Sequence, residues 1–344
     1  MFVHGKAEIG KLAVPVATSW LIGACMEAKG KQDLWTQQKP EALAALREQA
    51  LIQSVESSNR IEGVIVDPGR LRPILLGGAV PRDRPEEELL GYRTALNWIF
   101  SRKGPQNITP DLILSLHEML QSHAADAGKW KARDNEIIEF LPSGERKVRF
   151  IPTAARQVPA QVKRLCAEYS RHAEEDAPAL LLTASFVFDF LCIHPFRDGN
   201  GRVSRLLTTL LLQNNGFNVS RYVSLERLIE ETKADYYRVL RECSIGWHDG
   251  ANSEVPWWNY LLGIVRQGYA EFARKIEQAA GPGKSELIRF AVERQHGQFS
   301  LADIAAQCPS VSSQLIKKVL LELKAQKRVK LTGRGRGAKW ERLS

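Results

Sequence analysis

The sequence lacks the features of a membrane protein and of a secreted, disulfide-rich one. No run of apolar residues among its 344 positions is long enough to cross a bilayer. Residues 1–11 carry charge, and the partly apolar stretch 12–26 that follows is interrupted by Pro15, Thr18 and Ser19, so no signal-peptide core is present. The five cysteines are scattered without metal-like spacing, and their odd number argues against a disulfide framework. We therefore expect a cytoplasmic protein in a reducing compartment, without a membrane segment.

Internal repeats and low-complexity tracts are missing as well, and strand-like patterns are confined to residues 135–151 and the C-terminal region. The rest of the chain has helical periodicity. A length of 344 residues is enough for two or three domains with a buried core. The sequence therefore predicts a mainly α fold: a helical bundle with a small β-hairpin, followed by a small C-terminal domain.

Positive charge is concentrated at the C-terminal end. Residues 284–344 contain 13 Lys and Arg against 5 Asp and Glu, an excess of 8 positive charges out of the formal net charge of +9. A Gly/Pro break at 279–283 separates this segment from a long helical pattern at 257–278. We expect this tail to be a separate domain.

A stretch of twelve mostly polar residues, 194–205, stands out. It follows the apolar helical segment 179–193 and leads into a second one, 203–212. Residues 194–205 read His-Pro-Phe-Arg-Asp-Gly-Asn-Gly-Arg-Val-Ser-Arg, which predicts a loop that leads into a helix N-terminus. The two glycines around Asn200 let the backbone N–H groups turn toward one point, where the helix dipole also favours an anion. Arg202 and Arg205 are three residues apart and share one helical face. This combination indicates a nucleotide phosphate site.

The dozen resembles the signature of the Fic family (filamentation induced by cAMP), His-x-Phe-x-Asp/Glu-Gly-Asn-Gly-Arg-x-x-Arg, whose members with this intact form mostly transfer AMP from ATP to a protein hydroxyl. The resemblance implies that His194 is the general base, Asp198 the Mg²⁺ ligand and Phe196 the anchor of the loop. The chemistry agrees, because imidazole has a near-neutral pKa and Asp198 is the only carboxylate in the loop. The implied phosphate contacts are Gly199, Asn200 and Gly201 for the α-phosphate, Arg202 for the β-phosphate and Arg205 for the γ-phosphate.

A second motif lies upstream, at residues 58–63, where a helical pattern that starts at Pro40 ends. Its Ser-x-x-x-Glu-Gly spacing resembles the inhibitory motif of the same family. The resemblance implies that Glu62 pairs with Arg205 and blocks the γ-phosphate, with Ser58 hydrogen-bonded nearby. Without the downstream signature, the same residues would be an ordinary polar helix end with a glycine cap.

Two further segments complete the expected site. Residues 135–140 and 147–151 alternate around a turn at 141–145, which predicts a hairpin; in the family a flap here binds the target as an added strand, whereas the alternative is a plain surface hairpin. The helical segment 235–240 resembles the helix that lines the adenine pocket. Tyr236, Tyr237 and Leu240 are its candidate contacts, although helical tyrosines are more often ordinary core residues.

The basic tail predicts a winged helix-turn-helix. We expect helices at 285–295, 300–306 and 311–326, strands at 329–332 and 338–342, and a basic wing at 333–337. The candidate contacts to duplex DNA are Ser313, Gln314, Lys317, Lys318, Arg334 and Arg336. Winged helices also serve in dimerisation or partner docking, and that alternative stays open.

The sequence thus predicts four parts: an N-terminal helical region (1–105), a catalytic core (106–278), a linker (279–284) and a winged helix (285–344). The resemblance implies a protein adenylyltransferase that uses ATP and Mg²⁺, modifies Ser, Thr or Tyr of a target protein or of itself, and is restrained by Glu62. Two alternatives stay open: a DNA-binding regulator with a nucleotide sensor or self-modifying core, and an enzyme that removes AMP with the help of Glu62. The oligomeric state is open too, a homodimer included.

Overall fold

The computed structural model describes residues 13–37, 40–122, 124–140, 144–175, 177–280, 284–295, 297–309, 311–333 and 338–343. The chain divides into two compact units, residues 1–275 and 276–344. Among the described residues, no helix is both long and apolar enough to span a membrane. Each unit is considered by itself.

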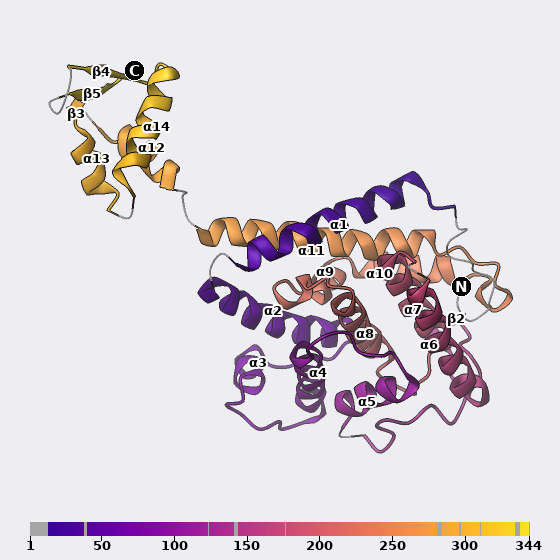
Figure 1. Cartoon of the computed structure of the whole chain (residues 1–344). Coiled ribbons are helices and arrows are strands. Elements are labelled where there is room, and N and C mark those ends of the chain that lie inside the picture. The colour runs from indigo at the N-terminus through magenta and orange to yellow at the C-terminus, as the bar shows by residue number, and fades with distance from the viewer. Residues whose placement is uncertain are drawn as a thin grey trace. The chain divides into compact units, whose positions relative to one another are not determined.

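The larger unit is built almost entirely of helices (Figure 1). Its helices are α1 (Val16–Thr36), α2 (Pro40–Ile61), α3 (Pro68–Leu75), α4 (Arg84–Ser101), α5 (Pro110–Leu120), α6 (Val158–Glu174), α7 (Ala179–Ile193), α8 (Asn200–Asn214), α9 (Leu225–Glu231), α10 (Lys233–Ser244) and most of α11 (Val255–Ala280). Strands β1 (Ile137–Phe140) and β2 (Arg146–Phe150) form an antiparallel hairpin. The predicted mainly α fold is confirmed.

Local sequence signals determine where several of these helices begin. Asp83 precedes α4 and its side chain accepts a hydrogen bond from the N–H of Glu86, and Thr109 does the same for Leu112 at the start of α5. Both helices also have proline in their first two positions, where a missing N–H costs nothing. These caps satisfy backbone groups that a helix end leaves free.

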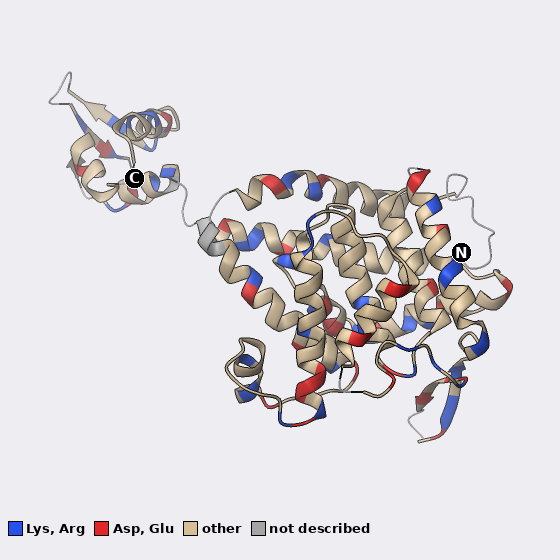
Figure 2. Ribbon diagram, turned by 60° about the horizontal axis from the view of Figure 1, so that its bottom comes forward, with Lys and Arg blue, Asp and Glu red and all other residues tan. Residues whose placement is uncertain are grey.

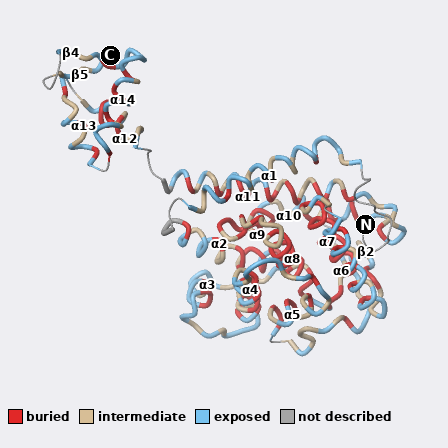
Figure 3. The backbone as a smooth tube through the Cα atoms, in the orientation of Figure 1, coloured by how far each residue is buried: buried red, intermediate tan, exposed pale blue. Residues whose placement is uncertain are grey.

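The core of this unit is formed by α7 and α8. Every residue of α7 from Leu180 to Ile193 is buried, and so is every residue of α8 from Arg202 to Leu212 (Figure 3). The apolar helix α7 is buried on all sides, unlike an amphipathic surface helix. Because the loop 194–199 joins the two helices, its ends are held by the most buried part of the molecule.

The helices that precede residue 105 pack on the other helices of the larger unit. Helix α2 contacts α4, α8 and α9. Helix α1 runs along α11 (Figure 1), where the Thr18 hydroxyl donates to Asn259 over 2.6 Å and the Cys25 thiol to the Leu262 carbonyl over 3.6 Å. All five cysteines are buried and free. The segment that carries the motif 58–63 is therefore an integral part of the larger unit.

The smaller unit contains three helices and a three-stranded antiparallel sheet. They are α12 (Lys284–Glu293), α13 (Leu301–Gln307) and α14 (Ser313–Ala325), with β3 (Gln298–Phe299), β4 (Val329–Thr332) and β5 (Lys339–Arg342) in the sheet order β3-β5-β4. Ser300 and Asp303 form a capping box at α13. The strand β3 was not predicted, because two residues are too short for a periodic pattern. Classification of this unit as a winged helix stays a prediction, and part of its expected wing, 334–337, lies outside the described residues.

Gly91 offers a test of how closely α4 approaches α5. A β-carbon at this position would lie 2.2 Å from the carbonyl oxygen of Leu120, a backbone atom that cannot move aside. We expect Gly91→Ala to lower the free energy of unfolding by roughly 1–3 kcal/mol, measured by urea denaturation.

The matched control is Gly23→Ala in the exposed interior of α1, where a β-carbon would meet nothing within 4 Å. Alanine should stabilise the protein there by roughly 0.5–1 kcal/mol, since it loses less conformational freedom on folding. Equal effects of the two substitutions would contradict the close approach of α4 and α5.

Candidate active site

The signature loop begins and ends in left-handed backbone. His194 directly follows α7 with φ of 50°, a conformation uncommon for a residue with a β-carbon, and Gly199 precedes α8 with φ of 82°. Helix α8 starts at Asn200, so Arg202 and Arg205 lie in its first two turns. The loop therefore reverses the chain between two buried helices and places His194 beside the N-terminus of α8.

Asn200 closes the loop from within. Its side-chain oxygen accepts the N–H of Phe196 over 2.9 Å, and its amide nitrogen donates to the Phe196 carbonyl over 2.8 Å. Phe196 is fully buried and stacks on His117, with ring centroids 3.8 Å apart, and on Trp130 at 5.2 Å. The Asn200 side chain is thus engaged in the loop itself, which leaves its backbone N–H to face an anion at the helix N-terminus.

Two buried residues that the sequence did not single out hold this loop from outside. His117 of α5 accepts the Gly128 N–H at Nδ1 and donates from Nε2 to the Asp198 carbonyl, 3.2 Å away. The backbone N–H of Lys131 donates to the Pro195 carbonyl over 2.9 Å. Burial lowers the pKa of Lys131 to about 8 and also lowers the pKa of His117. A polar residue on the apolar face of α5 was the only signal in the sequence for His117.

Arg205 is held by the predicted inhibitory motif. Its Nε donates to the Ser58 hydroxyl and its Nη2 donates to the Ser58 carbonyl and to the Glu62 carboxylate, all over 2.8 Å. Arg205 and Ser58 are buried, whereas the Glu62 side chain is 31% exposed. Burial lowers the pKa of Arg205, but Glu62, Tyr236 and Tyr92 together outweigh it and the net shift is upward. The structure therefore brings Ser58, Glu62 and Arg205 together as the sequence predicted.

Arg202 is bound to a residue that the sequence did not reveal. Its Nη1 donates to Glu88 of α4 and, over 3.3 Å, to the Asn59 side-chain oxygen, while Nη2 lies 3.5 Å from the Asp198 carboxylate. Arg202 and Glu88 are both almost fully buried. Glu88 belongs to a run of three glutamates, so nothing in the sequence distinguished it from its exposed neighbour Glu87.

His194 faces a cavity of about 470 Å³. Its Nδ1 lies 3.2 Å from the Leu191 carbonyl, which can only accept, so Nδ1 carries the proton and Nε2 is free as a base. Burial, with a smaller effect of Lys131, lowers the pKa of His194 to about 4 against the opposing effects of the Leu191 carbonyl, Glu62 and Asp198. The imidazole is therefore neutral near pH 7.

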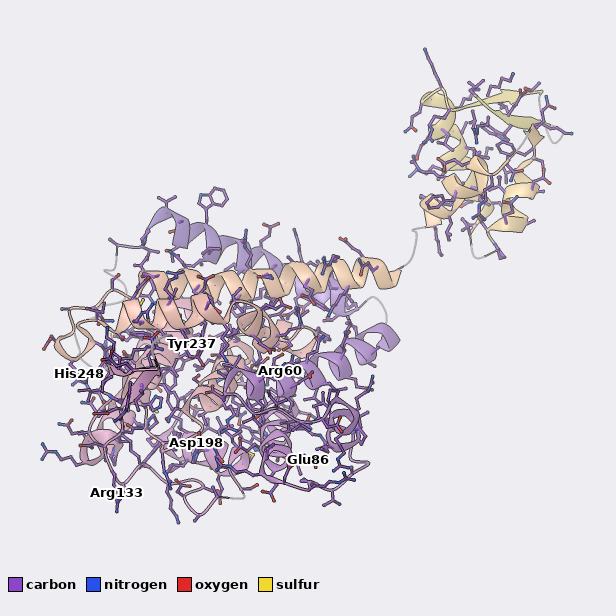
Figure 4. All side chains as sticks on the ribbon, turned by 180° about the vertical axis from the view of Figure 1, so that it is seen from behind. Arg60, Glu86, Arg133, Asp198, Tyr237 and His248 are labelled. Atoms are coloured by element: carbon purple, nitrogen blue, oxygen red, sulfur yellow. The ribbon has the colours of Figure 1, made fainter. Side chains whose placement is uncertain are left out.

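The predicted adenine contacts line the same cavity. Tyr236 and Leu240 are buried and Tyr237 is half-buried, and all three share the cavity with His194, Glu62 and Gly201. Figure 4 labels Tyr237 on α10 and Asp198 on the loop. Residues of the hairpin also line the cavity, among them Ile138 and Arg149. The cavity thus joins a histidine, a helix N-terminus and two aromatic rings, as a nucleotide site requires.

Asp198 is the one carboxylate of the loop, and its side chain is 55% exposed. Burial raises its pKa, but Arg202, the Gly199 N–H, Arg84 and Gln121 together bring it below the ordinary value. No group of three or more His, Cys, Asp or Glu residues that could hold a metal occurs in the described ranges. A single accessible carboxylate fits Mg²⁺ that takes its other oxygens from phosphates and water.

The predicted DNA contacts are not part of this site. Ser313, Gln314, Lys317 and Lys318 are exposed on α14 of the smaller unit. Arg334 and Arg336 lie outside the described residues.

This helical fold is shared with solved structures of the Fic class. A Fic family protein from Desulfovibrio desulfuricans G20 is 20% identical, covers 96% of this chain with 97% of its own, and superposes with a TM-score of 0.64. A fragment of Fic-1 from Caenorhabditis elegans is also 20% identical and covers 76% of this chain with 73% of its own, with a TM-score of 0.61.

Sequence comparison agrees with the fold. Residues 107–212 match the Fic/DOC family model, so this part of the chain carries a Fic domain. Protein adenylyltransferase fic-1 of C. elegans is 26% identical over 215 residues, which cover 61% of this chain, and protein adenylyltransferase Fic of Drosophila melanogaster is 23% identical over 274 residues, which cover 72%. The matched segments span 40% and 52% of the length of those two relatives.

The depressed pKa of His194 predicts its titration. As the pH falls from 7 to 5, its imidazole should stay neutral, because burial disfavours the charged form and the pKa is about 4. NMR of the ¹³Cε1 signals checks this, with His194→Gln to assign the resonance. The pKa of His194 is lower in the folded protein than the ordinary value of 6.5. Its contribution to the free energy of unfolding is therefore fully present above pH 6.5 and is lost as the pH falls toward 4. A midpoint near 6.5 would contradict the buried environment.

Proposed function

We propose that this chain is a protein adenylyltransferase that transfers AMP from ATP to a Ser, Thr or Tyr hydroxyl of a target protein or of itself. The observation that carries the proposal is the cavity in which His194, the N-terminus of α8 and the Tyr236–Tyr237 pair face one another. The names of the curated relatives, protein adenylyltransferase, support it.

In the proposed reaction, Nε2 of His194 takes the proton from the target hydroxyl as its oxygen bonds to the α-phosphorus. The bond from the α-phosphorus to the bridging oxygen breaks, and pyrophosphate leaves. The N–H groups at the start of α8, together with Arg202 and Arg205, stabilise the negative charge. Mg²⁺ held by Asp198 would neutralise phosphate charge.

The hairpin is suited to hold the target. Within the described part of the chain its two strands pair only with each other, and Ile138 and Val148 are exposed on it. A free strand edge binds an extended peptide through backbone hydrogen bonds, with little dependence on its sequence. A target segment added here would lie at the edge of the cavity that contains His194.

Glu62 is the proposed restraint. Its carboxylate lies so close to Gly201 that a β-carbon there would be 2.1 Å from Oε1, so it stands over the first turn of α8. It also occupies the guanidinium of Arg205, which is expected to bind the γ-phosphate. A charged hydrogen bond of this kind contributes about 1.5–3 kcal/mol. Glu62 and the nucleotide therefore compete for one guanidinium.

The restraint is tested with labelled ATP and Mg²⁺. Glu62→Gly should raise incorporation of AMP into protein at least ~10-fold, the effect of about 1.4 kcal/mol. Glu62→Gln keeps the shape but not the charge and should give an intermediate rate. In the Glu62→Gly background, Arg205→Ala should be inactive, and His194→Ala should lose roughly 10²–10⁴-fold in rate.

Equal labelling by the wild type and Glu62→Gly would remove Glu62 from the mechanism, and full labelling by His194→Ala would remove the general base. Incubation of the labelled Glu62→Gly product with unlabelled wild type tests the reverse activity. Release of AMP by the wild type but not by Glu62→Gln would assign Glu62 to AMP removal instead.

We propose in addition that the smaller unit is a winged helix that binds duplex DNA. The exposed Lys317 and Lys318 on α14 and the excess of positive charge after residue 284 support this.

DNA affinity should fall steeply with salt, and Lys317→Ala with Lys318→Ala should reduce the slope of log K against log salt by about 2. Fluorescence anisotropy with a genomic fragment measures it. Lys324→Ala, exposed in the last turn of the same helix, is the matched control and should leave the slope unchanged. Affinity that is absent or insensitive to salt would favour a protein-docking module.

A further inference from the structure

The Asp198 carboxylate is already surrounded by donors. Its Oδ2 lies 3.2 Å from Nη2 of Arg84, 3.3 Å from Nε2 of Gln121 and 3.5 Å from Nη2 of Arg202. Its Oδ1 accepts the Gly199 N–H over 2.6 Å. Two of these donors are guanidiniums, so the negative charge of the Asp198 carboxylate is already neutralised by Arg84 and Arg202.

Arg84 is the donor that can leave. Its side chain is 65% exposed, whereas that of Arg202 is 2% exposed and Gln121 is buried. Its Nε is bound to Glu88, one turn along α4, over 2.6 Å. Arg84 can therefore release Asp198 and stay beside it, tethered by Glu88.

The surroundings give a path for an ion to this carboxylate. Arg84 and Asp198 line a hollow of about 560 Å³, together with His117, Gln121, Asp126 and Arg197. A divalent cation would lie about 2.0–2.1 Å from Oδ2, and the guanidinium held 3.2 Å from the same atom would repel it because both are positively charged. The cation and Arg84 therefore compete for this carboxylate oxygen.

We propose that Arg84 is a positioning residue that takes the place of the divalent cation on Asp198 when no metal is bound, and so sets the affinity of the site for that cation. The proposal rests on the metal role of Asp198 in the proposed function. Arg84 keeps the carboxylate neutralised and oriented toward the hollow, and the arriving cation displaces it.

Binding of Mn²⁺ tests the proposal without any turnover. Its dissociation constant is measured by EPR of free Mn²⁺ at saturating ADP, which lacks the γ-phosphate that Glu62 is proposed to exclude, so the intact wild-type chain can be used. Arg84→Ala should bind Mn²⁺ about 2- to 5-fold more tightly, the range set by an exposed ion pair. Arg84→Lys keeps the charge and should stay close to wild type.

Two controls isolate the contact. Arg197→Ala removes the same charge from the same hollow and should change the Mn²⁺ dissociation constant by less than about 2-fold, because the ion pairs of Asp198 are with Arg84 and Arg202 and an exposed charge outside such a pair is screened. In an Asp198→Asn background, Arg84→Ala should have no effect. The affinity for ADP measured in EDTA should be the same with and without Arg84.

An unchanged or weaker Mn²⁺ affinity in Arg84→Ala would overturn the proposal, and weaker ADP binding in EDTA would show that Arg84 is a phosphate ligand instead. Absence of Mn²⁺ binding in every variant, wild type included, would contradict the metal role of Asp198, and the proposal on Arg84 would fail with it.

Discussion

The burial of two guanidiniums at the start of α8 is the constraint on which the site depends. Arg202 and Arg205 are 1% and 3% exposed, although each carries a positive charge. A buried charge is tolerated only with well-placed partners, and here they come from other helices: Glu88 from α4, and Ser58 and Glu62 at the end of α2. The arginines therefore tie three helices together where the phosphates are expected.

This arrangement links stability to function. Arg205 is paired with Glu62 at the place where the proposed function requires a phosphate. The nucleotide would therefore have to replace Glu62, because the guanidinium is already occupied. Glu88, in contrast, is buried on Arg202 and is not among the residues that line the cavity of His194. The Glu62 side chain, which is 31% exposed, is thus positioned to leave its arginine. The Glu88 side chain, which is 4% exposed, is positioned to stay.

The sequence predicted the parts of the fold that have local signals. The bounds of α7 coincide with the expected 179–193, because an apolar run ends at a polar loop there. The strand at 329–332 was also located correctly, and the contact of Glu62 with Arg205 followed from the two motifs. The sequence did not predict which residues pair in the tertiary structure. Nothing in the sequence indicated that Glu88 would meet Arg202, 114 residues further along the chain.

The same reason explains the other omissions. His117 and Lys131 support the loop through hydrogen bonds to backbone carbonyls, which impose no pattern on the sequence. Asn200 was expected to face the α-phosphate, and only the structure reveals that its side chain holds Phe196. A residue inside a motif can therefore be identified from spacing while the direction of its side chain cannot.

The attachment of α2 determines what kind of switch Glu62 can be. Arg60 is bound to both carboxylate oxygens of Glu230 on α9, at 2.7 and 3.0 Å, and the adjacent Asn59 is fully buried. Withdrawal of the helix would break these contacts, whereas Glu62 lies beyond its last residue and can turn away by side-chain rotation alone. Rotation of an exposed side chain takes picoseconds to nanoseconds. The restraint would then act as a rapid equilibrium that lowers apparent nucleotide affinity by the fraction of open rotamer, and a higher ATP concentration would overcome it.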